Sequence, residues 1–251
     1  MATSAQPAHQ DVVKDLAPTG VLRAAINYGN MVLAQRDAAT GAPAGVSVDL
    51  ARELARRLGV AVDLIAYDAA GKVFDAAKSA AWDVAFLAID PVRAAEIDFT
   101  PPYVLIEGTY LVRKDSPIRS IEDVDREGVR VAIGKGAAYD LFLTRTMKKA
   151  QLVRLPTSAA AIEYFASENL DAAAGVKQPL VRYALSHPET RVIDGRFMAI
   201  EQAMGTPRGR SAGWRYLCDF IEDVKASGFV ARGLERSGQH DAVVAPALRR
   251  A

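Results

Sequence analysis

The segment WDVAFLAIDPVRAAEIDFTPPY, residues 82–103, carries the clearest structural signal in the chain. Its first eight residues form an apolar run interrupted only by Asp83, which is typical of a strand covered on both faces. Asp90 followed by Pro91 is typical of a helix start, because a carboxylate caps free N–H groups and proline has no N–H to leave unpaired. Arg93 is therefore expected in the first turn of a helix at the carboxyl end of a strand, where open α/β sheets bind ligands.

Strand and helix signals alternate on both sides of this segment. Residues 48–58 place apolar side chains at helical spacing, with Ser47 as the expected N-cap and Gly59 as the expected stop. After residues 114–117 the alternation restarts with a buried strand at 129–133 and a further helix. The pattern predicts an α/β protein along its whole length.

Two details qualify this pattern. Pro101 and Pro102 are expected to keep residues 99–103 out of a central strand, because proline cannot donate to a sheet ladder.

Residues 79–85 and 167–173 share Ser, an apolar residue, Asp and Ala at the same offsets, each after a helix and before a strand. This favours an internal repeat, with chance as the alternative.

Composition excludes several classes of protein. The 251 residues are 50 % hydrophobic and 24 % charged, which is ordinary for a globular protein able to bury its own core. A net charge of +1 is too small to hold nucleic acid by its overall field. The single cysteine, Cys218, excludes an intramolecular disulfide and a zinc cluster of thiolates, and the three histidines are far apart, so no metal is expected.

Membrane and export signals are also not expected. No run approaches the roughly 18 apolar residues of a membrane helix, so direct insertion is not predicted. The first twenty residues lack the basic start and apolar core of a secretory signal. No cofactor motif is found either, since the Gly-Lys-Gly turn at 134–136 lacks the rest of a phosphate-binding loop.

Several phrases together resemble the bacterial extracellular solute-binding proteins of family 3. They are GVSVDLAREL (45–54), WDVA (82–85), PVRA (91–94), IDFTPPY (97–103) and LVRKDS (111–116). The resemblance covers about residues 20–235 and implies the two-lobe type II periplasmic-binding fold, with a ligand cleft between lobes joined by two crossing hinge strands. It implies a discontinuous first lobe, residues 1–112 and 200–251, and a second lobe of residues 113–199.

The resemblance also implies where a ligand binds. Arg93 corresponds to the arginine that grips the ligand's α-carboxylate in this family, and a planar guanidinium suits that task. The alternative is a surface arginine paired with Glu96. The full set of expected ligand-binding residues is Tyr28, Asn30, Ala88, Asp90, Arg93, Glu107, Gly134, Lys135, Gly136, Ala137 and Lys177.

One position departs from the amino-acid binders of this family. They place an acidic residue just after the strand corresponding to 170–174, where it takes the ligand's ammonium, but here the sequence is Gly-Val-Lys-Gln, residues 175–178. Lys177 at this place would repel an ammonium group. The ligand is therefore either an amino acid held by Asp90 and Glu107 or an organic acid without an amine.

Two functions follow from the resemblance. The first is a monomeric, non-catalytic receptor that captures a small carboxylate-bearing metabolite and passes it to an ABC permease, with the periplasm as its location and the cytoplasm as the alternative. The second is an enzyme on the same scaffold, similar to cyclohexadienyl dehydratase, in which Asp90, Glu107 or Glu201 acts as general acid. A sensory domain is a third possibility, which needs a signalling partner.

Overall fold

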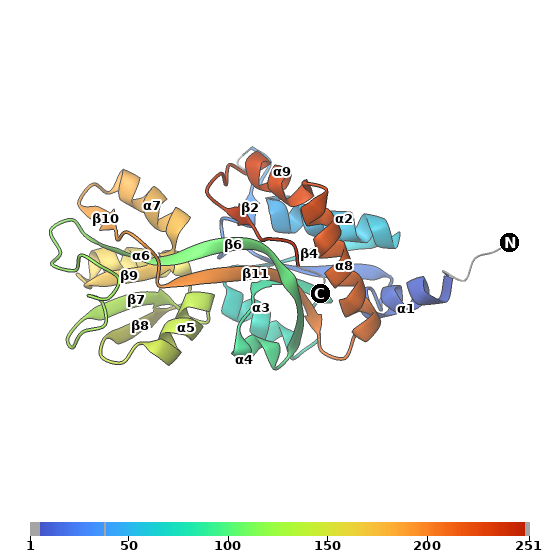
Figure 1. The fold of residues 1–251 in the computed structure, drawn as a ribbon, viewed down its shortest axis with the longest axis horizontal. Coiled ribbons are helices and arrows are strands. Elements are labelled where there is room, and N and C mark those ends of the chain that lie inside the picture. The colour runs from blue at the N-terminus through green and yellow to red at the C-terminus, as the bar shows by residue number, and fades with distance from the viewer. Residues whose placement is uncertain (1–5, 38, 249–251) are drawn as a thin grey trace.

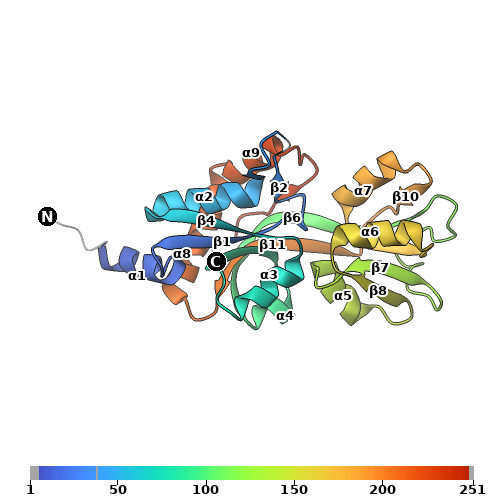
Figure 2. The same ribbon diagram turned by 180° about the vertical axis from the view of Figure 1, so that it is seen from behind.

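The structure, a computed structural model, describes residues 6–37 and 39–248. Figures 1 and 2 show an elongated molecule in which two groups of helices and strands are joined by two long strands, β6 (Ile97–Arg113) and β11 (Met198–Pro207). These strands pair with each other in antiparallel fashion, from Ile97 opposite Pro207 to Gly108 opposite Met198. The first expected lobe boundary, 112/113, lies at the end of β6, and the second, 199/200, lies near the start of β11.

The first group is built on parallel strands that continue the central pair. The order in the sheet is β4 (Ala61–Tyr67), β1 (Val21–Asn27), β5 (Val84–Ala88) and then β11, and β5 is buried along its whole length, as its apolar run predicts. A small hairpin of β2 (Gln35–Arg36) and β3 (Pro43–Ala44) stands apart from the sheet. The helices of this group are α1 (Gln6–Leu16), α2 (Val46–Leu58), α3 (Ala70–Ala77), α4 (Pro91–Ala94), α8 (Ser211–Ala226) and α9 (Phe229–Arg236).

The second group repeats this plan on the other side of the central strands. From β6 the sheet continues through β9 (Ala172–Val176), β7 (Arg130–Gly134) and β8 (Gln151–Leu155), while β10 (Thr190–Val192) also pairs with β6. The helices are α5 (Ala138–Thr146), α6 (Ser158–Ser167) and α7 (Lys177–Ser186). The predicted α/β class with two crossing strands is therefore present.

The predicted helix after residue 47 is confirmed, with a different start. Helix α2 begins at Val46 with Gly45 as its N-cap, so the expectation that Ser47 caps it is wrong. The Ser47 hydroxyl is buried and lies 3.2 Å from the Tyr103 hydroxyl instead. Gly59 ends the helix in the left-handed region at φ 70°, as predicted.

The expectation that Pro101 and Pro102 lie outside a central strand is wrong, because β6 passes through both. The register between β6 and β11 shifts at this point, which removes the need for a regular ladder of N–H donors. The N–H of Met204 instead donates to the Thr100 hydroxyl at 3.2 Å. An irregularity in the pairing thus accommodates the two prolines.

The internal repeat is confirmed by equivalent contacts in the two groups. Asp83 comes just before β5 and accepts a hydrogen bond from the backbone N–H of Arg23 on β1, at 3.1 Å. Asp171 comes just before β9 and accepts one from the backbone N–H of Arg130 on β7, at 2.7 Å. Both strand pairs are parallel, so each aspartate joins the same two neighbours in its half of the molecule.

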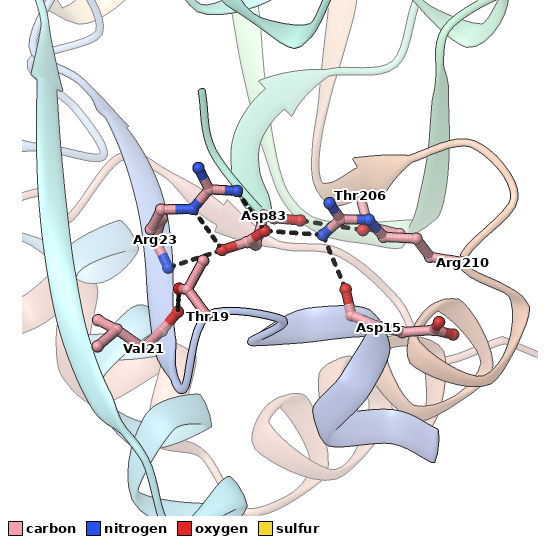
Figure 3. A network of polar contacts seen from close by, with 7 residues as sticks. All are labelled: Asp15, Thr19, Val21, Arg23, Asp83, Thr206 and Arg210. Atoms are coloured by element: carbon pink, nitrogen blue, oxygen red, sulfur yellow. Dashed lines mark hydrogen bonds and ion pairs between the residues drawn. The ribbon is translucent and has the colours of Figure 1, made fainter. Parts of the chain in front are cut away.

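The aspartate of the first group is buried at the centre of a larger network (Figure 3). Its carboxylate accepts from the Arg23 guanidinium at 2.8 and 2.9 Å and from Arg210 at 2.9 Å. Arg210 also donates to the Asp15 carbonyl at 2.7 Å, and the Thr206 hydroxyl donates to the Asp83 carbonyl at 2.9 Å. Asp83 therefore ties α1, β1, β11 and the start of α8 together.

The C-terminal segment packs against the sheet. After α9, the short strand β12 (Val243–Val244) pairs with β6, and the N–H of Ala245 donates to the Tyr103 carbonyl at 3.0 Å. The ammonium of Lys225 donates to the Pro246 carbonyl at 3.0 Å. These contacts anchor the chain as far as residue 246 to the first group.

Candidate functional site

A small cavity of about 40 Å³ lies where the two groups meet. Both halves of the molecule contribute to its walls. The first group supplies residues from the ends of β1, β5 and β11 and from the starts of α3 and α4, and the second supplies residues from the starts of α5, α6 and α7. The wall residues used below are Asn27, Asn30, Ala88, Arg93, Gln202, Gly134, Lys135, Ala137, Tyr139, Thr157, Ser158 and Val176.

Arg93 on α4 is the buried cation of this cavity. Helix α4 starts as predicted, with the Asp90 carboxylate accepting from the N–H of Val92 at 2.9 Å. The Arg93 side chain is 1 % exposed and donates to the carbonyls of Ala88 and Gly136, both at 2.9 Å. Its Nε is buried and has no partner among the described residues.

The environment of Arg93 lacks the anion that such a group needs. Burial lowers the pKa of the guanidinium to about 10, although the charge of Asp90 acts in the opposite direction. Within the described residues, no aspartate or glutamate lines the cavity. The two carbonyl oxygens that accept from Arg93 offset only part of the cost of removing its charged guanidinium from water. The site therefore favours a ligand that brings a negative charge.

Besides α4, four longer helices begin at this cavity. Ala70 and Ala138, at the starts of α3 and α5, line it, as do Ser158 at the start of α6 and Val176 at the N-cap of α7. The first turns of α3, α5 and α7 have no side-chain cap. Helix starts present free N–H groups and the positive end of the helix dipole, so they add to the charge of Arg93.

The Gly-Lys-Gly turn brings the second group up to this site. A Cβ on Gly134 would lie 2.9 Å from the backbone nitrogen of Ser158, so glycine allows the start of α6 to approach. Gly136 has φ +71° and packs against Gly71 of the first group, where a Cβ would lie 2.8 Å from the Gly71 Cα. Lys135 lies between the two glycines with an exposed side chain. The turn thus forms one wall of the cavity and a contact between the groups.

A wider cavity of about 510 Å³ adjoins the small one and shares Asn30, Tyr139, Thr157, Ser158 and Val176 with it. Its own walls are mostly apolar and come from both groups. They include Tyr28, Met31, Ile162, Pro179 and Tyr183. Tyr28, whose ring lies 4.7 Å from the Arg36 guanidinium, therefore lines this wider cavity and not the small one. We call the wider cavity the mouth of the site.

The structure brings together most of the residues expected from the sequence. Asn30, Ala88, Arg93, Gly134, Lys135 and Ala137 line the small cavity, Gly136 accepts a hydrogen bond from Arg93, and Tyr28 lines the mouth. Three acidic or basic candidates lie elsewhere.

Lys177 and Glu107 do not line the small cavity, so the expectation that they contact a ligand there is corrected. Lys177 pairs with Glu107 at 2.8 Å, and Arg196 donates to the same carboxylate at 3.1 Å. The hydrogen bond from Lys177 lowers the pKa of Glu107. All three border a different groove, beside α7 and the C-terminal segment. The neighbouring Val176, not Lys177, lines the cavity.

Asp90 and Glu201 are likewise placed outside the small cavity. Asp90 is 4 % exposed and its carboxylate, besides capping α4, pairs with Arg145 of the second group at 2.7 Å. Glu201 is exposed on β11. The dehydratase-like alternative needs a carboxylic acid in the cleft, and none of its three candidates lies there.

Several wall residues were not predicted. Asn27 and Gln202 are 8 % and 4 % exposed. Tyr139 donates to the Ser158 hydroxyl at 2.5 Å, and the Thr157 hydroxyl caps α6. The Thr-Ser pair before a helix was a usable signal, whereas the amides come from strands far apart in the sequence.

The family assignment follows from the sequence match. Residues 24–239 match the bacterial extracellular solute-binding proteins, family 3. The chain belongs to this family. The family is one of solute-binding proteins, in agreement with the prediction of a non-catalytic receptor. Among curated proteins, none matches this chain.

Solved structures of similar fold include amino-acid-binding proteins. A mutant of ArgBP from T. maritima has 20 % sequence identity, covering 91 % of this chain and 100 % of that one, with a TM-score of 0.78. The ABC transporter protein AbpA from Streptococcus pneumoniae, bound to L-arginine, has 20 % identity over 88 % and 96 %, with a TM-score of 0.77. AncCDT-1, an ancestral amino-acid-binding protein and precursor of cyclohexadienyl dehydratase, has 23 % identity over 89 % and 98 %, with a TM-score of 0.75.

These likenesses confirm the predicted type II periplasmic-binding fold. No helix within residues 6–37 and 39–248 is both long and apolar enough to span a bilayer. In the part of the chain that the structure describes, no cluster of three His, Cys, Asp or Glu residues is suited to hold a metal ion.

Proposed function

We propose that this solute-binding protein is a receptor that captures a small carboxylate-bearing metabolite between two lobes. The observation that carries the proposal is Arg93, whose guanidinium is buried and lines a cavity, and whose Nε has no partner among the described residues. A carboxylate accepts two parallel hydrogen bonds from a guanidinium and supplies the missing negative charge. The helix starts around the cavity favour the same ligand.

The two lobes of this proposal are residues 1–112 with 200–251 and residues 113–199, hinged on β6 and β11. Three contacts join them next to the cavity. Arg93 donates to Gly136, Asp90 pairs with Arg145, and Gly71 packs against Gly136. A ligand that bridges Arg93 and the helix starts of the second lobe would hold the lobes in this closed arrangement.

The biological setting rests on the family and its transporter relatives. A receptor of this kind hands its ligand to an ABC permease in the membrane, and we place this protein in the periplasm as a monomer. The closed lobes present a surface that differs from that of the separated lobes, because Asp90 and Arg145 meet only when they close. The permease can thereby distinguish the loaded receptor.

A thermal-shift titration of the purified protein tests the ligand class. The panel contains amino acids, 2-oxo acids, 2-hydroxy acids, aliphatic and aromatic monocarboxylates, and dicarboxylates. A ligand at a hundred times its dissociation constant adds about 2.7 kcal/mol to the folded state, which moves the midpoint by several degrees in a protein of this size. Arg93→Gln should abolish the shift.

Arg210→Gln is the matched control, because Arg210 is also a largely buried arginine but pairs with Asp83 away from the cavity. We expect this variant to melt at a lower temperature and to keep the full ligand-induced shift. A wild type that responds to no acid, or an Arg93→Gln variant that responds as the wild type does, would refute the receptor proposal.

A further inference from the structure

We propose that the ligand is a carboxylic acid without an α-ammonium group and with an apolar remainder. In place of the ammonium, its α-carbon bears hydrogen, a hydroxyl or a keto oxygen. This inference rests on the proposed function, since it assumes that Arg93 holds the carboxylate. It narrows the class of ligand beyond an acid in general. Its three supports are the charge of the cavity, the size of the cavity and the nature of the mouth.

The charged residues on the wall of the cavity are both cations. An α-ammonium is attached one carbon from the carboxylate, so it would stand beside Arg93. The charged wall residues there are Arg93 and Lys135, both cations, and within the described chain no carboxylate joins them. The uncapped starts of α3 and α7, which have no acidic residue in their first turns, add partial positive charge.

An ammonium in this place would be desolvated without an anion to pair with. Asp90, three residues before Arg93, already pairs with Arg145 at 2.7 Å and accepts a hydrogen bond from the first turn of α4. Burying an unpaired charge costs several kcal/mol, which corresponds to a loss of at least about a hundredfold in affinity. The α-position therefore carries a neutral group.

Neutral polar partners are available for such a group. The Gln202 amide lines the cavity and is almost fully buried. The Asn27 amide lies on the same wall and uses its oxygen to accept from the N–H of Gly29 at 3.0 Å. Amide N–H groups that remain on both side chains can donate to a keto or hydroxyl oxygen.

The size of the cavity agrees with a carboxylate head. A volume of 40 Å³ holds about three water-sized groups, which matches one carboxylate carbon with its two oxygens. The rest of the ligand must therefore extend into the adjoining cavity of 510 Å³. Val176 lies at the junction, because it lines both.

The mouth suits an apolar remainder. Met31 of the first group and Ile162 and Pro179 of the second line this cavity. Its charged residues are peripheral, since Asp68, Glu163 and Arg182 are exposed and Asp68 pairs with Lys72 at 2.8 Å. Burial of an aliphatic or aromatic tail here contributes about 25 cal/mol for each square ångström removed from water.

Isothermal titration calorimetry on the full chain with matched ligand series tests the inference. One series is L-leucine, 4-methyl-2-oxopentanoate, 2-hydroxy-4-methylpentanoate and 4-methylpentanoate; the other is L-phenylalanine, phenylpyruvate and 3-phenylpropionate. Acetate and succinate complete the set as acids without an apolar tail. We expect at least one amine-free acid in a series to bind about a hundredfold or more tighter than its amino acid.

A pair of variants at Val176 makes the test independent of the natural ligand. Val176 is the N-cap of α7 with an extended backbone, a position that Asp and Asn both favour. Val176→Asp places a carboxylate on the cavity wall and should shift the preference toward the amino acid by tenfold or more. Val176→Asn has the same shape without the charge and should leave the preference for the amine-free acid in place.

The outcomes separate this inference from the proposed function. If amino acids bind as tightly as their amine-free partners or more tightly, the inference is overturned while the carboxylate receptor stands. If only acetate or succinate binds, the apolar remainder is wrong. If no acid binds at all, the proposed function fails and takes the inference with it.

Discussion

The two equivalent aspartates allow a test of how burial determines the contribution of an ion pair to the free energy of unfolding. Asp83 and Asp171 each accept the backbone N–H of an arginine on the neighbouring parallel strand. Their surroundings differ, since the Asp83 side chain is 0 % exposed and the Asp171 side chain is 41 % exposed. We predict that Asp83→Asn lowers the free energy of unfolding much more than Asp171→Asn does.

The magnitudes follow from the partners. Asp83 pairs with two guanidinium groups at 2.8 and 2.9 Å, and its loss leaves Arg23 and Arg210 facing each other with side chains only 26 % and 19 % exposed. Removing one partner of a buried pair costs 3–5 kcal/mol, and the partial exposure of the arginines places this case near about 3 kcal/mol. Asp171 lies 3.9 Å from the Arg130 guanidinium at the surface, which gives about 1 kcal/mol for the pair and the backbone contact.

Thermal unfolding followed by far-UV circular dichroism measures both variants. At about 2–4 °C per kcal/mol for a protein of this size, Asp83→Asn should lower the midpoint by about 6–12 °C and Asp171→Asn by about 2–4 °C. An Asp83→Asn variant that loses no more stability than Asp171→Asn would refute the reasoning. The two carboxylates would then differ in burial but contribute equally to the free energy of unfolding.

The pH dependence of the same variant supplies a second check. Burial raises the pKa of Asp83, but the hydrogen bonds from Arg23 and Arg210 outweigh it, and the net pKa lies below the ordinary value of 3.8. A carboxyl whose pKa is lowered by folding stabilises the protein above its unfolded pKa and loses that effect as the pH falls through its folded pKa. The stability difference between wild type and Asp83→Asn should therefore be constant from pH 5 to 7 and shrink below about pH 4.

Two further predictions concern the contact between the lobes. Gly71→Ala should raise stability slightly, by up to about 1 kcal/mol, because alanine favours α3. Its Cβ would lie 3.2 Å from the Lys135 carbonyl, so ligand affinity measured by calorimetry should fall several-fold, and unchanged affinity would show that this contact is not part of closure. Arg145→Ala leaves Asp90 buried without its cation when the lobes close, so we expect about fivefold weaker binding, roughly 1 kcal/mol, with an unchanged melting temperature of the ligand-free protein. Unchanged affinity in this variant would show that the pair does not stabilise the closed form.

Local signals predicted the framework well because short-range chemistry determines it. The Asp90-Pro91 pair starts α4, and Gly59 ends α2, as the sequence indicates. The buried run before Asp90 forms β5. In each case the deciding contacts lie within a few residues of the signal, so the sequence alone contains them.

The failures occur where distant segments decide. The prolines of β6 are accommodated by a register shift against β11, a strand about a hundred residues away. Lys177 was assigned to the cleft because it follows β9, but the side chain on the cavity wall belongs to the preceding residue, Val176. A shift of one residue in an extended segment turns a side chain to the other side, and the sequence does not show which side faces the ligand.

The cavity brings together groups that repel one another unless an anion lies between them. Arg93 comes from the first lobe, and the starts of α6 and α7 come from the second, so closure moves like charges together. The direct contacts across the cleft, such as the Arg93 hydrogen bond to Gly136, offset only part of this repulsion. A carboxylate bound between Arg93 and the helix starts would turn this repulsion into attraction, because each positive group is then attracted to the same negative charge. Under the proposed function, the charge that gives the ligand its affinity is thus also the charge that favours closure, and we expect a neutral molecule of the same shape to gain neither.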